Sequence, residues 1–127
     1  MRALSVKQPW AELIARGTKK VEFRTWKVDF RGELLIVASK GRQNETCEEN
    51  GIDPDAVPYG KAVCVVDLVD VVESGEAPGE YDWKLENPRR VEPVEIRGYA
   101  AIYNVAEEHI RLAADPSIER RGDADRV

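Results

Sequence analysis

Residues 60–72 constrain the fold more strongly than any other stretch of this sequence. They read GKAVCVVDLVDVV, and the predominance of β-branched valine is typical of a strand rather than a helix. Asp67 and Asp70 interrupt the apolar run on opposite faces, a pattern that predicts a bulge or a bend. We therefore expect the longest strand of the chain to be irregular, and the sheet around it to be strongly curved.

Five further strands are predicted on either side of this one. Period-two patterns or short apolar runs place them at residues 2–6, 20–26, 33–39, 81–86 and 98–105. Asn87-Pro88 follows the strand at 81–86 and should end it, because this dipeptide favours a turn. Residues 41–60 are polar and contain several turn formers, so they predict a long loop that holds one helical turn near residues 46–50.

One helix is predicted early in the chain and a shorter one near its end. Proline suits the first helical turn, so residues 8–10 predict a helix start, and Gly17 is a natural stop. The apolar face of this helix includes Ile14 and leaves Glu12 pointing away from it. Residues 106–114 predict the second helix, because acidic side chains in its first turn would stabilise the positive end of the helix dipole.

These segments make an α+β domain over residues 1–114. The expected architecture is a small mixed or antiparallel β-barrel of five to six strands, with an early helix and a short C-terminal helix. Residues 115–127 are charged and nearly devoid of apolar side chains, so they predict a disordered tail. The apolar runs are too short to span a bilayer, and no signal peptide or disulfide framework is evident. We therefore expect a cytoplasmic protein that does not associate with membranes.

Charge is distributed unevenly along the chain. The formal net charge of −5 argues against a nucleic-acid coat protein or a membrane-surface binder. Residues 1–42, however, carry a net charge of +6, and residues 45–86 carry −10. This polarisation is compatible with a basic working face and an acidic remainder. The acidic segment would repel an extended duplex, so any nucleic acid is expected to bind with a small footprint.

The densest polar cluster lies at residues 17–26, which read GTKKVEFRTW. Lys19 falls at the turn between the early helix and the next strand, while Glu22 and Arg24 project from one face of that strand. Such a group of charges can shift pKa values and bind phosphates or polar bases. The alternative interpretation is a solvated strand face, whose ion pairs are worth at most about 1 kcal/mol each.

Several segments in a fixed order resemble the ASCH family (activating signal cointegrator homology). They are LSVKQPWA at residues 4–11, G-x-K-x-x-E-x-R-x-W at 17–26, RGxLLI continuing to AS at 31–39, WxLxNPR at 83–89 and RG at 97–98. The resemblance covers about residues 2–106. It implies a PUA-like fold, which is a small β-barrel with helices, and a cleft that binds RNA or another nucleic acid.

The resemblance also implies which residues line this cleft. Lys19, Glu22 and Arg24 match the family signature position by position. A lysine suits a phosphate contact, a carboxylate accepts from a base edge, and the planar fork of an arginine holds a phosphate. The residues expected to bind nucleic acid are Gln8, Trp10, Lys19, Lys20, Glu22, Arg24, Ser39, Lys40, Asn87 and Arg89.

Each tryptophan has two interpretations. Trp10, Trp26 or Trp83 could stack on a base, a contact worth ~1–3 kcal/mol. A core position is at least as plausible for each ring, because three aromatic side chains of this size dominate a small core.

Two alternative functions follow from the same residues. The family contains ribonucleases and amidohydrolases of an acylated cytidine, so a hydrolase using Lys19 and Glu22 is the first alternative. The amidohydrolases have threonine at the position of Glu22, a departure that weakens that activity. The second alternative is a protein-interaction module whose acidic residues 45–86 dock a basic partner. No cofactor is expected, and a divalent cation would concern only the nuclease.

Overall fold

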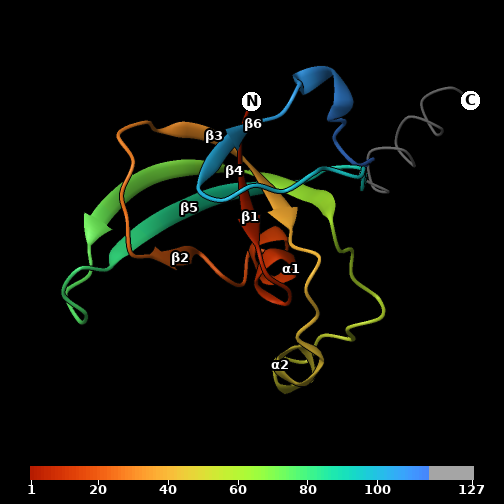
Figure 1. Cartoon of the computed structure of the whole chain (residues 1–127), viewed down its shortest axis with the longest axis horizontal. Coiled ribbons are helices and arrows are strands. Elements are labelled where there is room, and N and C mark those ends of the chain that lie inside the picture. Colours follow the sequence, from red (N-terminus) through yellow and green to blue (C-terminus); the bar gives the residue numbers. More distant parts are fainter. Residues whose placement is uncertain (115–127) are drawn as a thin grey trace, which may run out of the picture.

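A six-stranded curled sheet organises residues 1–114, which are the part of the chain that the computed structural model describes (Figure 1). The elements are β1 (Arg2–Val6), α1 (Trp10–Ala15), β2 (Val21–Arg24), β3 (Gly32–Ala38), α2 (Asn44–Glu49), β4 (Lys61–Glu73), β5 (Tyr81–Arg90), β6 (Ile102–Asn104) and a 3-10 turn (Glu107–His109). The strand order is β2-β5-β4-β3-β1-β6. The predicted α+β class is confirmed, and the predicted tail at 115–127 lies outside the described residues.

The sheet is mixed and bends because its two longest strands are irregular. β1 and β3 run parallel, and the other neighbouring strands run antiparallel. The β4–β5 register shifts between Val65 and Asp67 and again between Leu68 and Asp70. Bulges of this kind increase local twist, so they account for the curl of the ribbon in Figure 1. The irregularity predicted from the two aspartates is therefore confirmed.

The predicted end of β5 at Asn87-Pro88 is wrong. The strand continues to Arg90, and Asn87 adopts a left-handed conformation with φ of 53°. From Glu86 to Arg89 the pairing moves by three residues along β5 but by only two along β4, so one extra β5 residue forms a bulge. Proline is tolerated there, since a bulged position need not donate to the ladder. Asparagine also visits left-handed backbone more readily than most residues.

The elements near the described end of the chain are shorter than predicted. The strand expected at residues 98–105 is reduced to β6, which pairs only with the first half of β1, and residues 98–101 form a loop. Ala101 in this loop has a φ of 57°. The helix expected at residues 106–114 is a single 3-10 turn, after which Leu112 forms an isolated bridge with Val91. Residues 105–112 are thus held by packing and by a single β-bridge, and not by a regular strand or helix.

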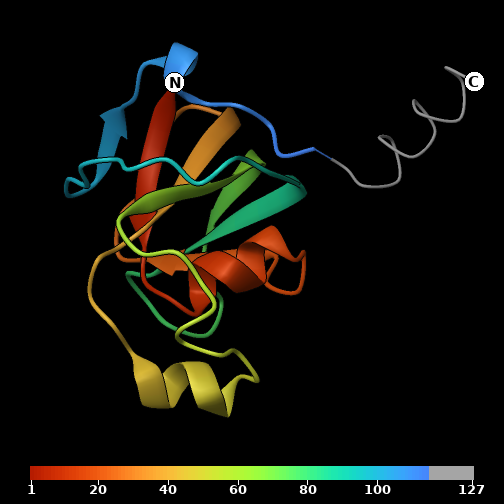
Figure 2. The same ribbon diagram turned by 90° about the vertical axis from the view of Figure 1, so that its right-hand side faces the viewer.

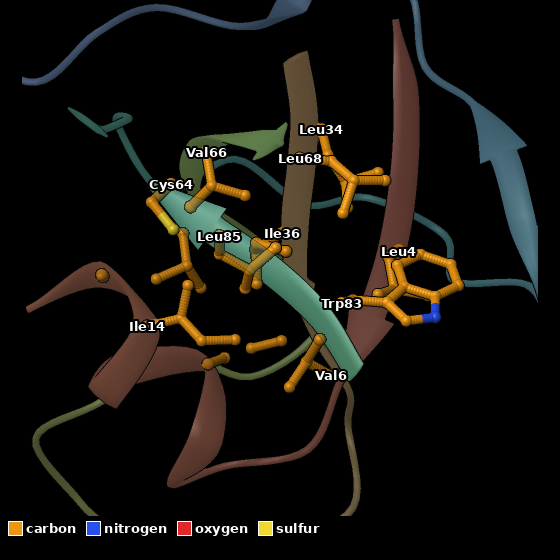
Figure 3. Packing of buried hydrophobic residues seen from close by; sticks show 14 residues of the cluster. Leu4, Val6, Ile14, Leu34, Ile36, Cys64, Val66, Leu68, Trp83 and Leu85 are labelled. Atoms are coloured by element: carbon orange, nitrogen blue, oxygen red, sulfur yellow. The ribbon is translucent and has the colours of Figure 1, made fainter. Parts of the chain in front are cut away.

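The main core lies between the concave side of the sheet and α1 (Figures 2 and 3). Trp83 is fully buried among Leu4, Ile36 and Leu85, and its indole Nε1 donates to the carbonyl oxygen of Trp26 at 3.1 Å. A second, smaller cluster packs on the other side of the sheet, against the segments that follow β5. Among the described residues, no helix is long and apolar enough to cross a membrane.

The helical pattern predicts that Glu12 points away from the core, and this prediction is wrong. Only 6% of its side chain is exposed, and its carboxylate accepts hydrogen bonds from Arg16 on the same helix and Arg90 on β5. Burial raises the pKa of Glu12, but the hydrogen bonds and charges of the two arginines outweigh it and leave the pKa below its ordinary value of 4.5. The sequence pattern missed the position because the partner arginine lies 78 residues away.

Replacing Glu12 by glutamine should make the free energy of unfolding depend less on pH in the acidic range. A carboxylate whose folded-state pKa is lowered stabilises the protein above its unfolded pKa, and this contribution is lost as the pH falls through the folded-state value. We expect Glu12→Gln to cost about 1–3 kcal/mol at pH 7 and much less near pH 3. Urea unfolding at both pH values measures the difference, and an equal loss at both would contradict the assignment.

Candidate functional site

Two adjoining pockets form one cleft across the carboxyl ends of β1 and β3, within residues 1–114. The first, named here the Glu22 pocket, measures about 300 Å³ and is lined by Lys7, Trp10, Glu22, Phe23 and Arg24. The second, the Tyr99 pocket, measures about 490 Å³ and is lined by Lys40, Ile96, Arg97, Gly98 and Tyr99. Ser5 and Ser39 line both pockets and form their shared floor.

β2 turns the charged side of its sequence toward this cleft. Glu22 lies opposite the buried Trp83 in the β2–β5 register, so the two residues occupy the same inner face. Glu22 is only 8% exposed, whereas its neighbour Phe23 is 56% exposed. The solvated-face interpretation is therefore wrong for Glu22, and the apolar phenylalanine takes the outer position instead. A strand that places a carboxylate inside and an aromatic ring outside departs from ordinary core patterning.

The Glu22 carboxylate has an unused acceptor. Its Oε1 accepts a hydrogen bond from the backbone N–H of Phe23 at 3.2 Å. Its Oε2 is buried and has no hydrogen-bond partner in the part of the chain that the structure describes. The nearest cation is Arg24, whose Nη2 lies 3.9 Å away, beyond hydrogen-bond reach. A buried acceptor left unsatisfied costs about 1–3 kcal/mol, so a donor from a ligand would be favourable here.

Arg24 connects β2 to the floor of the cleft. Its Nη2 donates to the carbonyl oxygen of Ser5 at 3.0 Å, joining the edge strand β2 to β1. About 25% of the Arg24 side chain remains exposed within the Glu22 pocket. The guanidinium has five N–H donors, so donors remain for an anionic group in the pocket.

Lys19 lies at the rim of the Glu22 pocket, over aromatic rings. Its Nζ is 4.7 Å from the centre of the Phe23 ring and 5.5 Å from the centre of the Trp10 ring. Cation–π contacts of this kind hold an ammonium in place while leaving its donors open to solvent. No hydrogen bond or ion pair joins Lys19 to Glu22 among the described residues. The catalytic role expected for them stays a prediction.

The structure gathers most of the predicted binding residues around this cleft. Trp10, Glu22, Arg24, Ser39 and Lys40 line it. Lys19 borders it and also lines a neighbouring pocket of about 260 Å³, together with the predicted residues Lys20 and Asn87.

Two predicted residues line neither the cleft nor this neighbouring pocket. Gln8 is fully buried, where its Nε2 donates to the carbonyl of Pro58 and its Oε1 accepts from the backbone of Glu12. It therefore holds the loop before β4 against α1. Arg89 donates to Glu33 and Asp67, beside a different pocket that both Arg89 and Glu33 line. Acidic neighbours neutralise this guanidinium, so it does not extend the basic cleft.

The three tryptophans divide between the two interpretations. Trp83 belongs to the core, with no exposed surface. Trp26 is half-buried and packs edge-on against Trp83, with ring centres 4.8 Å apart. Trp10 is half-buried and lines the Glu22 pocket, so it is the tryptophan that a ligand in this pocket can reach.

Sequence reasoning missed the aromatic rims of the cleft. Phe23 lies between the charged residues Glu22 and Arg24 of a predicted strand, and Tyr99 lies within the predicted strand at residues 98–105, so neither pattern marks a binding residue. Arg97 and Gly98 belong to the family pattern, but that pattern does not say what they contact. Gly98 lies so close to β1 that a Cβ there would sit 2.9 Å from the Ser5 hydroxyl. The glycine therefore permits the loop to approach the floor of the cleft.

Family and sequence comparisons agree with this architecture. The model of the ASCH domain matches residues 4–102. Activating signal cointegrator 1 of Homo sapiens is 40% identical over 79 residues, which cover 53% of this chain, and its Mus musculus counterpart is 39% identical over 79 residues. The match covers 14% of each of these two proteins, so this chain spans only a small part of their length.

Solved structures with a similar fold come from Zymomonas mobilis. The crystal structure of its ASCH protein is 12% identical, with a TM-score of 0.59, and the match covers 84% of this chain and 88% of that chain. A mutant of the same protein gives a TM-score of 0.60 at 12% identity, covering 84% and 91% of the two chains. At this identity the likeness concerns the fold, and it confirms the predicted PUA-like architecture.

Proposed function

The chain belongs to the ASCH domain family, and from this membership we propose that it binds single-stranded RNA in the cleft between β2 and the Tyr99 loop. The PUA-like fold of the family is associated with RNA binding. In this chain the ligand would have a small footprint of one or a few nucleotides, because the two pockets are small and the segment 45–86 carries a net charge of −10.

The unpartnered Oε2 of Glu22 is the observation that carries this proposal. A buried acceptor beside an exposed aromatic ring and two cations matches the chemistry of one nucleotide. The exocyclic amine of a base would donate to Glu22, the base would contact Trp10 or Phe23, and a phosphate would be held by Arg24 and Lys19. Uridine lacks an exocyclic amine, so it is the base that fits this arrangement least well.

Binding should depend on salt but not on divalent metal. For a ligand with two or three contacted phosphates, raising the salt from 50 to 200 mM is expected to weaken binding about 7- to 20-fold. We propose that no cofactor takes part, so EDTA should leave the affinity unchanged. Fluorescence anisotropy with a labelled A/C-containing hexanucleotide RNA measures both effects, with a DNA of the same sequence for comparison. An affinity that ignores salt would contradict phosphate binding in the cleft.

A further inference from the structure

The Tyr99 pocket resembles the Glu22 pocket in having an exposed aromatic ring with a cation on it, and it lies on the opposite side of the shared floor. Tyr99 is 53% exposed, and the guanidinium carbon of Arg97 lies 5.3 Å from the centre of its ring. In the Glu22 pocket, Phe23 is exposed in the same way and carries Lys19 at 4.7 Å. An exposed aromatic ring with a cation stacked on it therefore stands on each side of Ser5 and Ser39.

The Tyr99 ring is supported from below rather than loosely placed. It packs edge-on against Tyr103 on β6, with ring centres 5.5 Å apart, and the Tyr103 hydroxyl shares a 2.8 Å hydrogen bond with Ser5. Burial raises the pKa of Tyr103, with the hydrogen bond to Ser5 acting in the opposite direction. The neutral phenol of Tyr103 thus connects the Tyr99 ring to the floor of the cleft, while about half of Tyr99 remains exposed to solvent.

The loop that carries Tyr99 has a costly backbone. Ala101 lies in the left-handed region, with φ of 57°, where a non-glycine residue costs about 1–2 kcal/mol. Gly98 is held against Ser5 so closely that a side chain would collide with the hydroxyl. Strain of this kind persists where the surrounding structure fixes a conformation, and it is concentrated at ligand sites. Here it presents an exposed aromatic ring at the edge of a pocket.

We propose that the Tyr99 pocket is a second nucleotide subsite, which stacks the base of the residue adjacent to the one held in the Glu22 pocket. This inference rests on the proposed function. The phosphate between the two nucleotides would lie over Ser5 and Ser39, within the reach of Arg24 on one side and Lys40 on the other. Base–aromatic stacking tolerates any base, so this subsite adds affinity without adding sequence preference.

Chain-length dependence tests the second subsite separately from the first. The probes are adenosine 5′-monophosphate, the RNA dinucleotide ApA with a 5′-phosphate, and A6 RNA, titrated by calorimetry or by competition. In the wild type the dinucleotide should bind about 5- to 150-fold more tightly than the mononucleotide. Tyr99→Ala should remove most of this gain and leave the mononucleotide affinity within twofold of wild type. Tyr99→Phe keeps the ring and should retain the gain.

The outcomes separate the two hypotheses. If the wild type binds none of the three probes, the proposed function fails, and the second subsite fails with it. If the wild type binds the dinucleotide no better than the mononucleotide, only the second subsite fails. Equal losses for both probes in Tyr99→Ala would also overturn it, since the ring would then support the first pocket. Circular dichroism of each variant identifies any loss of folded protein. In that case Tyr99→Leu provides the test, because leucine can still pack against Tyr103 but has no aromatic face on which a base can stack.

Discussion

Replacing Trp83 by alanine should lower the free energy of unfolding by about 3–5 kcal/mol, the range for truncating a large aromatic residue in a core. Trp83 has no exposed surface, packs among residues from β1, β3 and β5, and holds Trp26 through an edge-on contact. Removing the indole leaves a cavity in the main core, next to the half-buried Trp26. Urea unfolding monitored by circular dichroism measures the loss, because circular dichroism does not depend on tryptophan fluorescence.

A second variant separates packing from hydrogen bonding at the same position. Trp83→Phe keeps an aromatic ring but removes the Nε1 donor, leaving the carbonyl of Trp26 without it. We expect Trp83→Phe to lower the free energy of unfolding by roughly half as much as Trp83→Ala, because most of the buried aromatic surface remains. Trp26→Phe is the matched control, since that ring is only partly buried and should cost less than either change at Trp83. A loss below about 1 kcal/mol in Trp83→Ala would contradict the central place of this ring in the core.

The double variant Lys19→Ala/Arg24→Ala should show the largest loss of RNA affinity, about 30- to 100-fold at 100 mM salt. Each cation supplies a charge-assisted contact to phosphate, and a loss of about 1–1.4 kcal/mol per contact multiplies to this range. Arg24→Ala alone is expected to account for about tenfold. Arg24 also donates to the Ser5 carbonyl, so thermal unfolding is measured in parallel to show that each variant remains folded.

The control for this experiment removes the same charge elsewhere. Arg31 lies on the turn before β3 beside Asp70, and Lys84 is exposed on β5, opposite Val21. Arg31→Ala/Lys84→Ala lowers the net charge by two but leaves the cleft intact, so its affinity should fall no more than about threefold through the general loss of positive charge. Equal losses in the two double variants would show that net charge, and not the cleft, determines binding.

Most of the fold could be predicted from local patterns. β1 follows from a short apolar segment, the long, bulged β4 from a run of β-branched valines, and α1 from the proline at its start and the glycine after its end. The failures occur where distant contacts decide. β5 continues through Pro88 because β4 lies beside it, and β6 is short because it pairs only with Arg2–Leu4 of β1. In both cases the pairing partner is distant in the sequence, so a short sequence segment cannot predict the outcome.

The candidate site could be predicted in part, and for a similar reason. Glu22 and Arg24 carry a recognisable signature, and both lie in the cleft. Arg89 belongs to an equally regular segment, yet the fold places it beside Glu33, 56 residues earlier in the chain. The family pattern includes Arg97 and Gly98 but not Tyr99, so the sequence does not distinguish this residue from a core tyrosine. Its importance becomes visible only when the loop is placed against Ser5.

The short edges of the sheet bear on self-association. β2 and β6, four and three residues long, are the two edge strands of the sheet in residues 1–114. An exposed strand edge is a template on which a second copy can extend a sheet, and short or charged edges oppose this. β2 carries Glu22 and Arg24 and is also tied to β1 through the Arg24 side chain. The charges proposed to hold a nucleotide thus also protect the sheet from growing into an aggregate.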